Sequence, residues 1–308
     1  MKITLDLDQL LKDEKITSVE YDRLKEMATQ ATGDLAFNIL IAFGVVAVTA
    51  GSVALFPSAT TAIVLGSLLL AGGTLSIQRQ WARWMILAQT CTLMGVLLVG
   101  AAIIDLYPES VGALVAVTAL LALFSLVARS GLLVVLATLA LSVTICASSS
   151  EPHQYTLEMK DPSTTVILFS IGAFGLYQLS SRVPTDYRRL AILSARTSVF
   201  LVNAGFWVGS LWGERVERGS PWRGEVIIDE RVYAVTWAIA IFTVAAWAWR
   251  RNLRWTVNAM AIFGGIHLFT QWFVYFDATP GTLLIGGLVA LIIGMGLKKL
   301  NSRMGNMS

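Results

Sequence analysis

The first residues with potential chemistry are three polar side chains in one otherwise apolar stretch. Arg189, Arg196 and Asn203 follow one another at intervals of seven residues, so a helix would align them as one stripe. An arginine within a membrane span costs about 2.5 to 3.5 kcal/mol on insertion scales, which makes Arg196 a functional candidate. We expect the stripe to bind an anion or a lipid headgroup from the cytoplasm. The alternative is that Arg196 snorkels to the nearby membrane interface.

The second candidate set centres on His267 in another apolar stretch. Gly264, His267, Gln271 and Tyr275 recur at intervals of three and four residues, which places them on one helix face. Histidine changes its charge near neutral pH, so this face could relay a proton along a water-filled path. The alternative is a satisfied contact between helices, because polar side chains commonly bond across helices in membranes.

The sequence offers little support for other chemistry. Its two cysteines, Cys91 and Cys146, lie in apolar stretches, and its two histidines belong to no cluster with metal-ligand spacing. A phosphate-binding glycine loop, a nucleophile elbow and a helical metalloprotease motif are all missing. We therefore expect no catalytic residues, no metal, no cofactor and no enzymatic activity. We also see no basic domain for nucleic acid.

The composition defines the solvent in which these residues act. Of the 308 residues, 56% are hydrophobic and 14% are charged, and the mean hydropathy is +0.68. Soluble domains carry about 25% charged residues, so a soluble globular domain is excluded. The chain has the composition of a polytopic membrane protein, with membrane lipids as its surroundings.

Apolar runs of about 20 residues are long enough to cross a bilayer as helices, and the sequence contains ten candidates. They predict an all-α transmembrane bundle with a cytoplasmic amphipathic helical segment at 1–34, a ten-span domain at 35–300 and a cytoplasmic tail at 301–308. The runs are 35–56, 59–77, 84–104, 110–128, 130–147, 164–181, 190–212, 232–249, 254–276 and 280–297. Two sets of five spans would permit inverted repeats, but no internal sequence match supports them.

The distribution of basic residues gives the orientation. With ten spans, 17 of the 23 Lys and Arg residues fall on the side of the N-terminus and 5 on the other side, while Arg196 lies within a span. Because cytoplasmic loops carry the excess of basic residues, both termini are predicted to be cytoplasmic.

Two segments outside the spans could bind a protein partner. Residues 1–34 read as two short amphipathic helices, and Thr17 with Glu20 has capping-box spacing. The 213–231 loop carries mixed charges. The alternatives are that the N-terminal helices dock on their own bundle and that the loop is only solvated.

Both ends of the chain resemble a known family. The stretches LLKDEKITSVEYDRLKEM and NAMAIFGGIHLFTQWFVYFDATPGTLLIGGLVALIIGMGLKKLN are similar to those of bacterial integral membrane proteins of the domain of unknown function 2157 type. The resemblance implies a location in the bacterial cytoplasmic (inner) membrane. It implies no activity and provides no catalytic residues.

Two functions of different classes follow from these observations. The first is transporter-like handling of a small polar or anionic solute or a lipid headgroup. In this hypothesis Arg196 binds the anionic group, His267 gates or shuttles a proton, and Asn203 and Gln271 orient the ligand. The second is a noncatalytic membrane subunit or scaffold that binds another protein.

Overall fold

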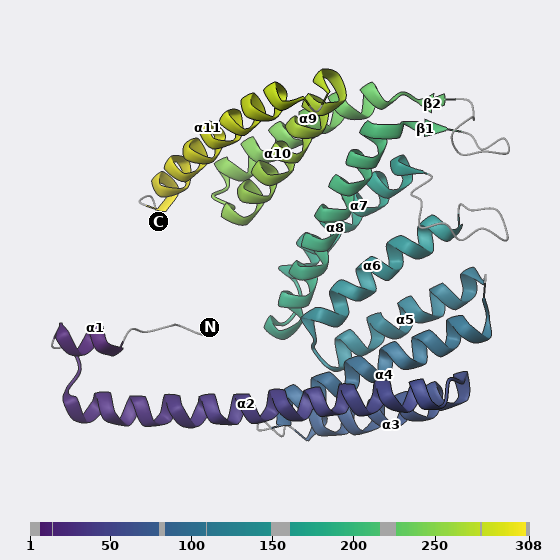
Figure 1. Ribbon diagram of the computed structural model, residues 1–308, viewed down its shortest axis with the longest axis vertical. Helices are drawn as coiled ribbons and strands as arrows, with labels where there is room; N and C mark the ends of the chain where they lie inside the picture. Colours follow the sequence, from purple (N-terminus) through teal and green to yellow (C-terminus); the bar gives the residue numbers. More distant parts are fainter. Residues whose placement is uncertain are drawn as a thin grey trace. The chain divides into compact units, whose positions relative to one another are not determined.

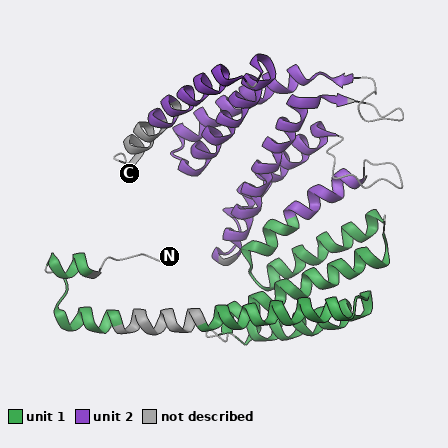
Figure 2. Cartoon of the chain, viewed as in Figure 1, with its two compact units in different colours: residues 1–137 green, residues 138–308 purple. Residues whose placement is uncertain are grey.

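The computed structural model consists of two compact units, each built from helices (Figure 1). Unit 1 is Met1–Ala137 and unit 2 is Thr138–Ser308, as coloured in Figure 2. The structure describes residues 7–13, 15–79, 84–108, 110–148, 161–215, 226–277 and 279–305, without the side chains at 7, 26–36, 148, 186, 215, 293 and 297–305.

Unit 1 is organised around helix α4, which packs against α2, α3 and α5. Its helices are α1 (Leu7–Lys12), α2 (Ser18–Leu55), α3 (Ala59–Gln78), α4 (Met85–Leu106), α5 (Val111–Val127) and the first part of α6 (Gly131–Ser148). The α3–α4 pair is the closest of these, because glycines at its centre bring the two backbones together.

In unit 2 successive helices pack on one another in chain order, from α7 to α11. After the rest of α6, its elements are α7 (Pro162–Ser180), α8 (Thr185–Trp212), β1 (Glu214–Arg215), β2 (Val226–Ile228), α9 (Glu230–Arg250), α10 (Arg254–Phe276) and α11 (Pro280–Gly305). The two strands pair antiparallel, with Glu214 opposite Ile228. This short ribbon within the 213–231 loop was not predicted from the sequence.

The all-α fold predicted from the sequence is confirmed. Each of the ten apolar runs falls on one helix, in order from α2 to α11. In the described part of the chain, seven of these helices are long and apolar enough to cross a membrane. The apolar stretches of α5, α6 and α11 are shorter, at 17 residues each.

The N-terminal segment differs from the prediction of two short helices. The second of them is the beginning of α2, which continues without a break for 38 residues from Ser18 into the first apolar run. The sequence between Met27 and Phe37 contains no proline and a single glycine, Gly33, so no strong stop signal ends the helix before the apolar run.

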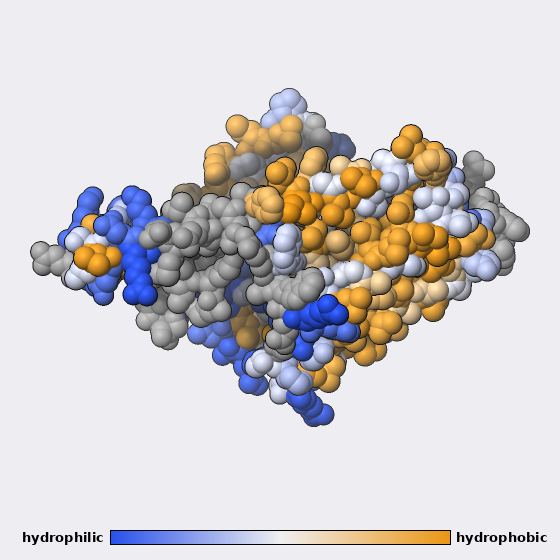
Figure 3. Space-filling view, turned by 90° about the horizontal axis from the view of Figure 1, so that it is seen from below, coloured by the Kyte–Doolittle hydropathy of each residue, from blue (hydrophilic) through white to orange (hydrophobic). Residues whose placement is uncertain are grey.

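The surface is the inverse of that of a soluble protein. Large apolar side chains face outward, including Phe43, Phe242 and Leu284, whereas many buried positions are occupied by small residues such as Ala88 and Thr92. In Figure 3, hydrophilic side chains gather at the end of unit 1 that carries α1, and hydrophobic ones cover most of the face formed by the following helices. Such a surface and seven long apolar helices characterise a multi-pass membrane protein.

The predicted capping box begins α2. The Thr17 hydroxyl accepts a hydrogen bond from the Glu20 backbone N–H at 3.3 Å, and Glu20 Oε2 accepts one from the Thr17 backbone N–H at 2.9 Å. Helix α1 contacts α2 through the Tyr21 hydroxyl, which donates to Asp8 Oδ1 at 2.8 Å. The N-terminal segment therefore packs on itself.

This capping box should make the start of α2 sensitive to acid. The backbone N–H of Thr17, and then its hydroxyl, hold the pKa of Glu20 below its ordinary value of 4.5. A carboxylate with a lowered pKa stabilises the folded form above the ordinary pKa, and this contribution is lost as the pH falls through the folded value. We expect hydrogen exchange at residues 18–25 of the full chain, relative to intrinsic rates, to increase between about pH 6 and about pH 3.5.

Two variants test the cause of this pH dependence. Glu20→Ala should exchange rapidly at both pH values, because it lacks the acceptor. Glu20→Gln should stay protected at both, because its amide oxygen can still accept from Thr17 and does not titrate. A wild-type chain whose exchange ratio does not change with pH would contradict the expectation.

Candidate functional site

Helices α8 and α10 meet through large side chains on one face of each helix. From one end to the other, the contacts are Arg196 with Trp255 (guanidinium carbon to ring centre, 4.7 Å), Phe200 with Phe263 (ring centres, 6.0 Å) and Trp207 with Thr270 (Nε1 to Oγ1, 3.0 Å). Residue numbers rise along both helices in this order, so α8 and α10 run parallel. Helix α9 packs against both of them.

Trp237 of α9 lies at the centre of this three-helix arrangement and is fully buried. Its Nε1 donates a hydrogen bond to Asn203 Oδ1 of α8 at 2.9 Å. Asn203 is also buried, and its Nδ2 donates to the Val199 carbonyl at 2.8 Å. Both ends of the Asn203 amide are thus engaged within the protein, where they position the indole of Trp237.

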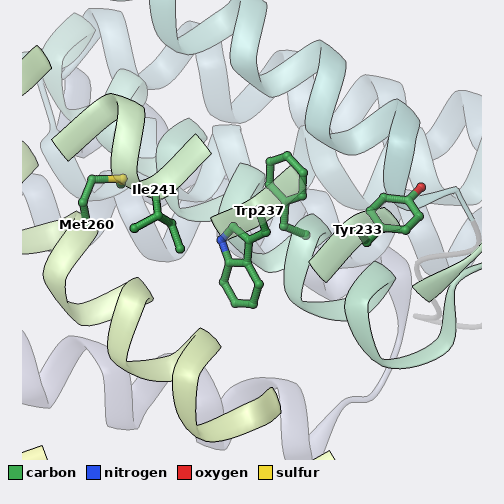
Figure 4. Packing of buried hydrophobic residues seen from close by; sticks show 5 residues of the cluster. Tyr233, Trp237, Ile241 and Met260 are labelled. Atoms are coloured by element: carbon green, nitrogen blue, oxygen red, sulfur yellow. The ribbon is translucent and has the colours of Figure 1, made fainter. Parts of the chain in front are cut away.

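An apolar cluster surrounds Trp237 (Figure 4). Tyr233, Trp237 and Ile241 recur every fourth residue and form the buried face of α9, while Met260 of α10 and Phe206 of α8 complete the cluster. Trp237 was not among the site residues predicted from the sequence. The signal that could have identified it is its place in the middle of an apolar run, between two other large residues at helical spacing.

His267 of α10 contacts the same indole. The rings of Trp237 and His267 are 4.8 Å apart between centres and meet edge to face at 73°. Gln271 follows one helical turn later. Among the described residues, two buried side-chain nitrogens have no hydrogen-bond partner, and these are His267 Nδ1 and Gln271 Nε2. We refer to Asn203, Trp237, His267 and Gln271 together as the Trp237 site.

The predicted polar face of α10 is therefore only partly inside the protein. Gly264 faces α9, since a Cβ built there would lie 3.6 Å from Ile241 Cγ2. His267 also faces α9, because its ring lies against that of Trp237. Tyr275, in contrast, is exposed. The inward part of this face thus runs from Gly264 to Gln271.

Arg196 is apart from the Trp237 site. It is exposed, and its guanidinium stacks over Trp255, the second residue of α10. The prediction that Arg196 lies some seven residues inside a span stays a prediction, and the candidate span Tyr187–Trp212 contains it. Helix α8 starts at Thr185, eleven residues before the contact of Arg196 with α10. Arg196 is therefore level with the first turn of α10. Arg189, also exposed, lies two turns nearer the start of α8.

A second polar cluster, which the sequence did not reveal, lies at the opposite end of these helices. The buried Glu214 carboxylate accepts hydrogen bonds from the Tyr233 hydroxyl at 2.5 Å and from Ser163 Oγ at 3.0 Å. The Tyr233 ring lies against Gly209, where a Cβ would approach it to 2.5 Å. The cluster ties α7 and α9 to β1. Residues 216–225 of the predicted partner-binding loop lie outside the described part of the chain.

In the described residues, no group of three or more His, Cys, Asp or Glu side chains is placed to hold a metal ion. Comparison of the chain with protein-family models, curated proteins and solved structures finds no match. The resemblance of the chain ends to domain of unknown function 2157 proteins stays a prediction.

Proposed function

We propose that this chain handles a small polar or anionic solute in the membrane, without enzymatic catalysis, and that the solute passes the Trp237 site. The observation that carries the proposal is the pair of unpartnered buried nitrogens, His267 Nδ1 and Gln271 Nε2, one turn apart on α10. Buried polar groups are normally hydrogen-bonded, so two nitrogens on one face that lack an acceptor among the described residues favour a bound solute or water as their partner.

The chemistry of the two groups indicates the class of ligand. The Gln271 amide nitrogen is a donor, and neutral imidazole offers one donor and one acceptor. A hydroxyl, carboxylate or phosphate oxygen would satisfy the amide, and water would do so between solute molecules. Arg196 and Arg189 lie toward the start of α8, where they would attract an anionic solute toward the site.

The proposal includes the topology predicted from the sequence. We infer that all ten helices from α2 to α11 cross the bilayer, because the 17-residue apolar stretches of α5, α6 and α11 reach the lower limit for a span. With ten spans, the excess of basic residues places both termini in the cytoplasm. The family resemblance supports a bacterial cytoplasmic membrane.

A vesicle assay tests the proposed function. The full chain is reconstituted in phosphatidylcholine vesicles, and uptake of glycerol, acetate and inorganic phosphate is followed by light scattering. We expect at least one probe to enter faster than it enters protein-free vesicles. Gln271→Leu should reduce that uptake by about tenfold, the effect of losing a hydrogen bond worth ~1.4 kcal/mol. His267→Phe should reduce it similarly.

Stability measurements separate this role from a structural one. Gln271→Leu removes an unpaired buried donor, so its unfolding temperature should not fall. Tyr275→Phe, an exposed position on the same helix, is the matched control and should change neither uptake nor stability. Uptake no faster than in protein-free vesicles for all three probes would show that the proposed function is wrong.

The alternative function is that of a noncatalytic membrane subunit or scaffold that binds another protein. In that case α1 and the beginning of α2, which precede the apolar window Phe37–Leu55, would contact the partner. Failure of the uptake assay would favour this function.

A further inference from the structure

The end of unit 2 at which α8 and α10 begin and α9 ends carries a dense set of arginines. We call it the arginine end, and all six of its arginine side chains are exposed: Arg188, Arg189, Arg196, Arg250, Arg251 and Arg254. Trp247, Trp249 and Trp255, all partly exposed, lie between them. Indole rings prefer the headgroup level of a bilayer, so this end belongs at a membrane surface.

The helices of unit 2 provide almost no negative charge to this end. The sequence has no Asp or Glu from Tyr187 to Gly213 or from Arg231 to Phe276, and helix α7, which packs on α8, has none either. The one acidic residue of α8 is Asp186, whose side chain is outside the described part. Within the described part of unit 2, the exposed Arg188, Arg189, Arg196, Arg250 and Arg251 have little neighbouring negative charge, which favours the binding of an anion at this end.

The offset between the helices creates a place for such an anion. Arg196 meets the second residue of α10, so the eleven residues of α8 before it extend beyond the start of α10. At 1.5 Å per residue this extension is about 16 Å long. Arg189 and Arg196 lie on the same face of α8, seven residues apart, with the turn between α9 and α10 beside Arg196.

Arg196 is prepared to bind an oxyanion. Its guanidinium stacks with one face on the Trp255 ring, at 4.7 Å. Stacking uses the face of the guanidinium and leaves its in-plane N–H groups available for a bidentate contact. No described residue accepts a hydrogen bond from these groups. The same stretches contain seven arginines and no lysine. Lysine or arginine would equally supply the positive charge that orients a span. The forked guanidinium of arginine, however, matches two oxygens of a phosphate.

We propose that the arginine end binds the phosphate headgroup of an anionic phospholipid, with Arg196 as the principal contact and Trp255 holding its guanidinium in place. Basic pockets between helices at a membrane surface bind such headgroups. The acyl chains would lie along the apolar, exposed surface of α8 and α10, where Phe200 and Ile262 face outward. This site shares Arg196 and Arg189 with the proposed attraction of an anionic solute, but it involves neither His267 nor Gln271, so lipid binding and solute uptake are tested by different variants.

Native mass spectrometry of the detergent-purified full chain tests the site. The chain is titrated with phosphatidylglycerol and, in parallel, with phosphatidylcholine. We expect retained phosphatidylglycerol and no comparable retention of phosphatidylcholine. Arg196→Gln should weaken phosphatidylglycerol binding by about tenfold, because it removes a charge-assisted contact. Arg196→Lys should weaken it by more than about twofold, because it keeps the charge and loses the bidentate geometry.

Arg231→Gln is the matched control, because Arg231 is an exposed arginine at the opposite end of α9. It should bind phosphatidylglycerol like the wild type. Trp255→Leu provides a second test, since it leaves every arginine in place and should still weaken binding. Equal losses in Arg196→Gln and Arg231→Gln, unchanged binding in Arg196→Gln or Trp255→Leu, full binding in Arg196→Lys, or complete displacement of the lipid by inorganic phosphate would each overturn the proposal.

Discussion

Trp237→Ala should lower the free energy of unfolding by about 3 kcal/mol or more. The indole is fully buried and contacts residues of α8, α9 and α10, so its removal leaves a cavity at the centre of three helices. In a membrane the surrounding lipid is as apolar as the core, but the lost packing contacts are not replaced. Thermal unfolding in detergent, followed by circular dichroism, would measure the effect.

The hydrogen bond to Asn203 can be separated from the packing of the ring. Trp237→Phe keeps an aromatic ring but leaves Asn203 Oδ1 unpaired, and Asn203→Leu leaves Trp237 Nε1 unpaired. Each should destabilise the chain by about 1 to 3 kcal/mol. The double variant should lose clearly less than the sum, because it leaves neither group orphaned. Strict additivity would show that the bond contributes nothing to stability.

The same variants bear on function. If Trp237 only fills space, solute uptake by the Trp237→Phe variant should fall in proportion to the fraction of that variant that remains folded. If the indole orients His267 through their edge-to-face contact, uptake should fall further than the folded fraction does. The comparison at equal folded fraction decides between a packing role and a positioning role.

The helices were predictable because their signals are local. Apolar runs of membrane length set α2 to α11, and Thr17 with Glu20 marked the start of α2. The failure at the N-terminus also has a local reason, since a cap signals where a helix begins but the sequence after Met27 gives no signal that it ends. The β1–β2 ribbon was not predictable, because two- and three-residue strands provide too few positions for an alternating pattern.

The site was less predictable because its geometry depends on register between helices. The stripe Arg196–Asn203 and the pair His267–Gln271 were found from spacing alone. The sequence could not show that Arg196 stacks on Trp255, because that contact depends on where α10 begins beside α8. Trp237 and Glu214 went unrecognised, since their partners Asn203 and Tyr233 are 34 and 19 residues away in sequence.

The second large effect is expected in unit 1, where Gly73→Ala should destabilise α3–α4 packing by about 2 kcal/mol. A Cβ at Gly73 would lie 2.5 Å from Thr92 Oγ1 and 2.8 Å from the Ala88 carbonyl oxygen, and backbone atoms of α4 cannot give way as a flexible side chain can. A Cβ at Gly95 would lie 2.7 Å from the Gly66 carbonyl oxygen, so the approach is equally close on the α4 side. Gly95→Leu should therefore prevent α3 and α4 from pairing, with loss of the monodisperse peak in size-exclusion chromatography.

The neighbouring residue provides an internal control. A Cβ at Gly72 would meet nothing within 4 Å, so Gly72→Ala adds a methyl group on the open side of the same helix. Alanine is the better helix former by about 1 kcal/mol, so this variant should be as stable as the wild type or more so. The two substitutions are chemically identical and one residue apart, so opposite changes in unfolding temperature would isolate the close approach of the backbones. Equal changes would mean that α3 and α4 are not held together at Gly73.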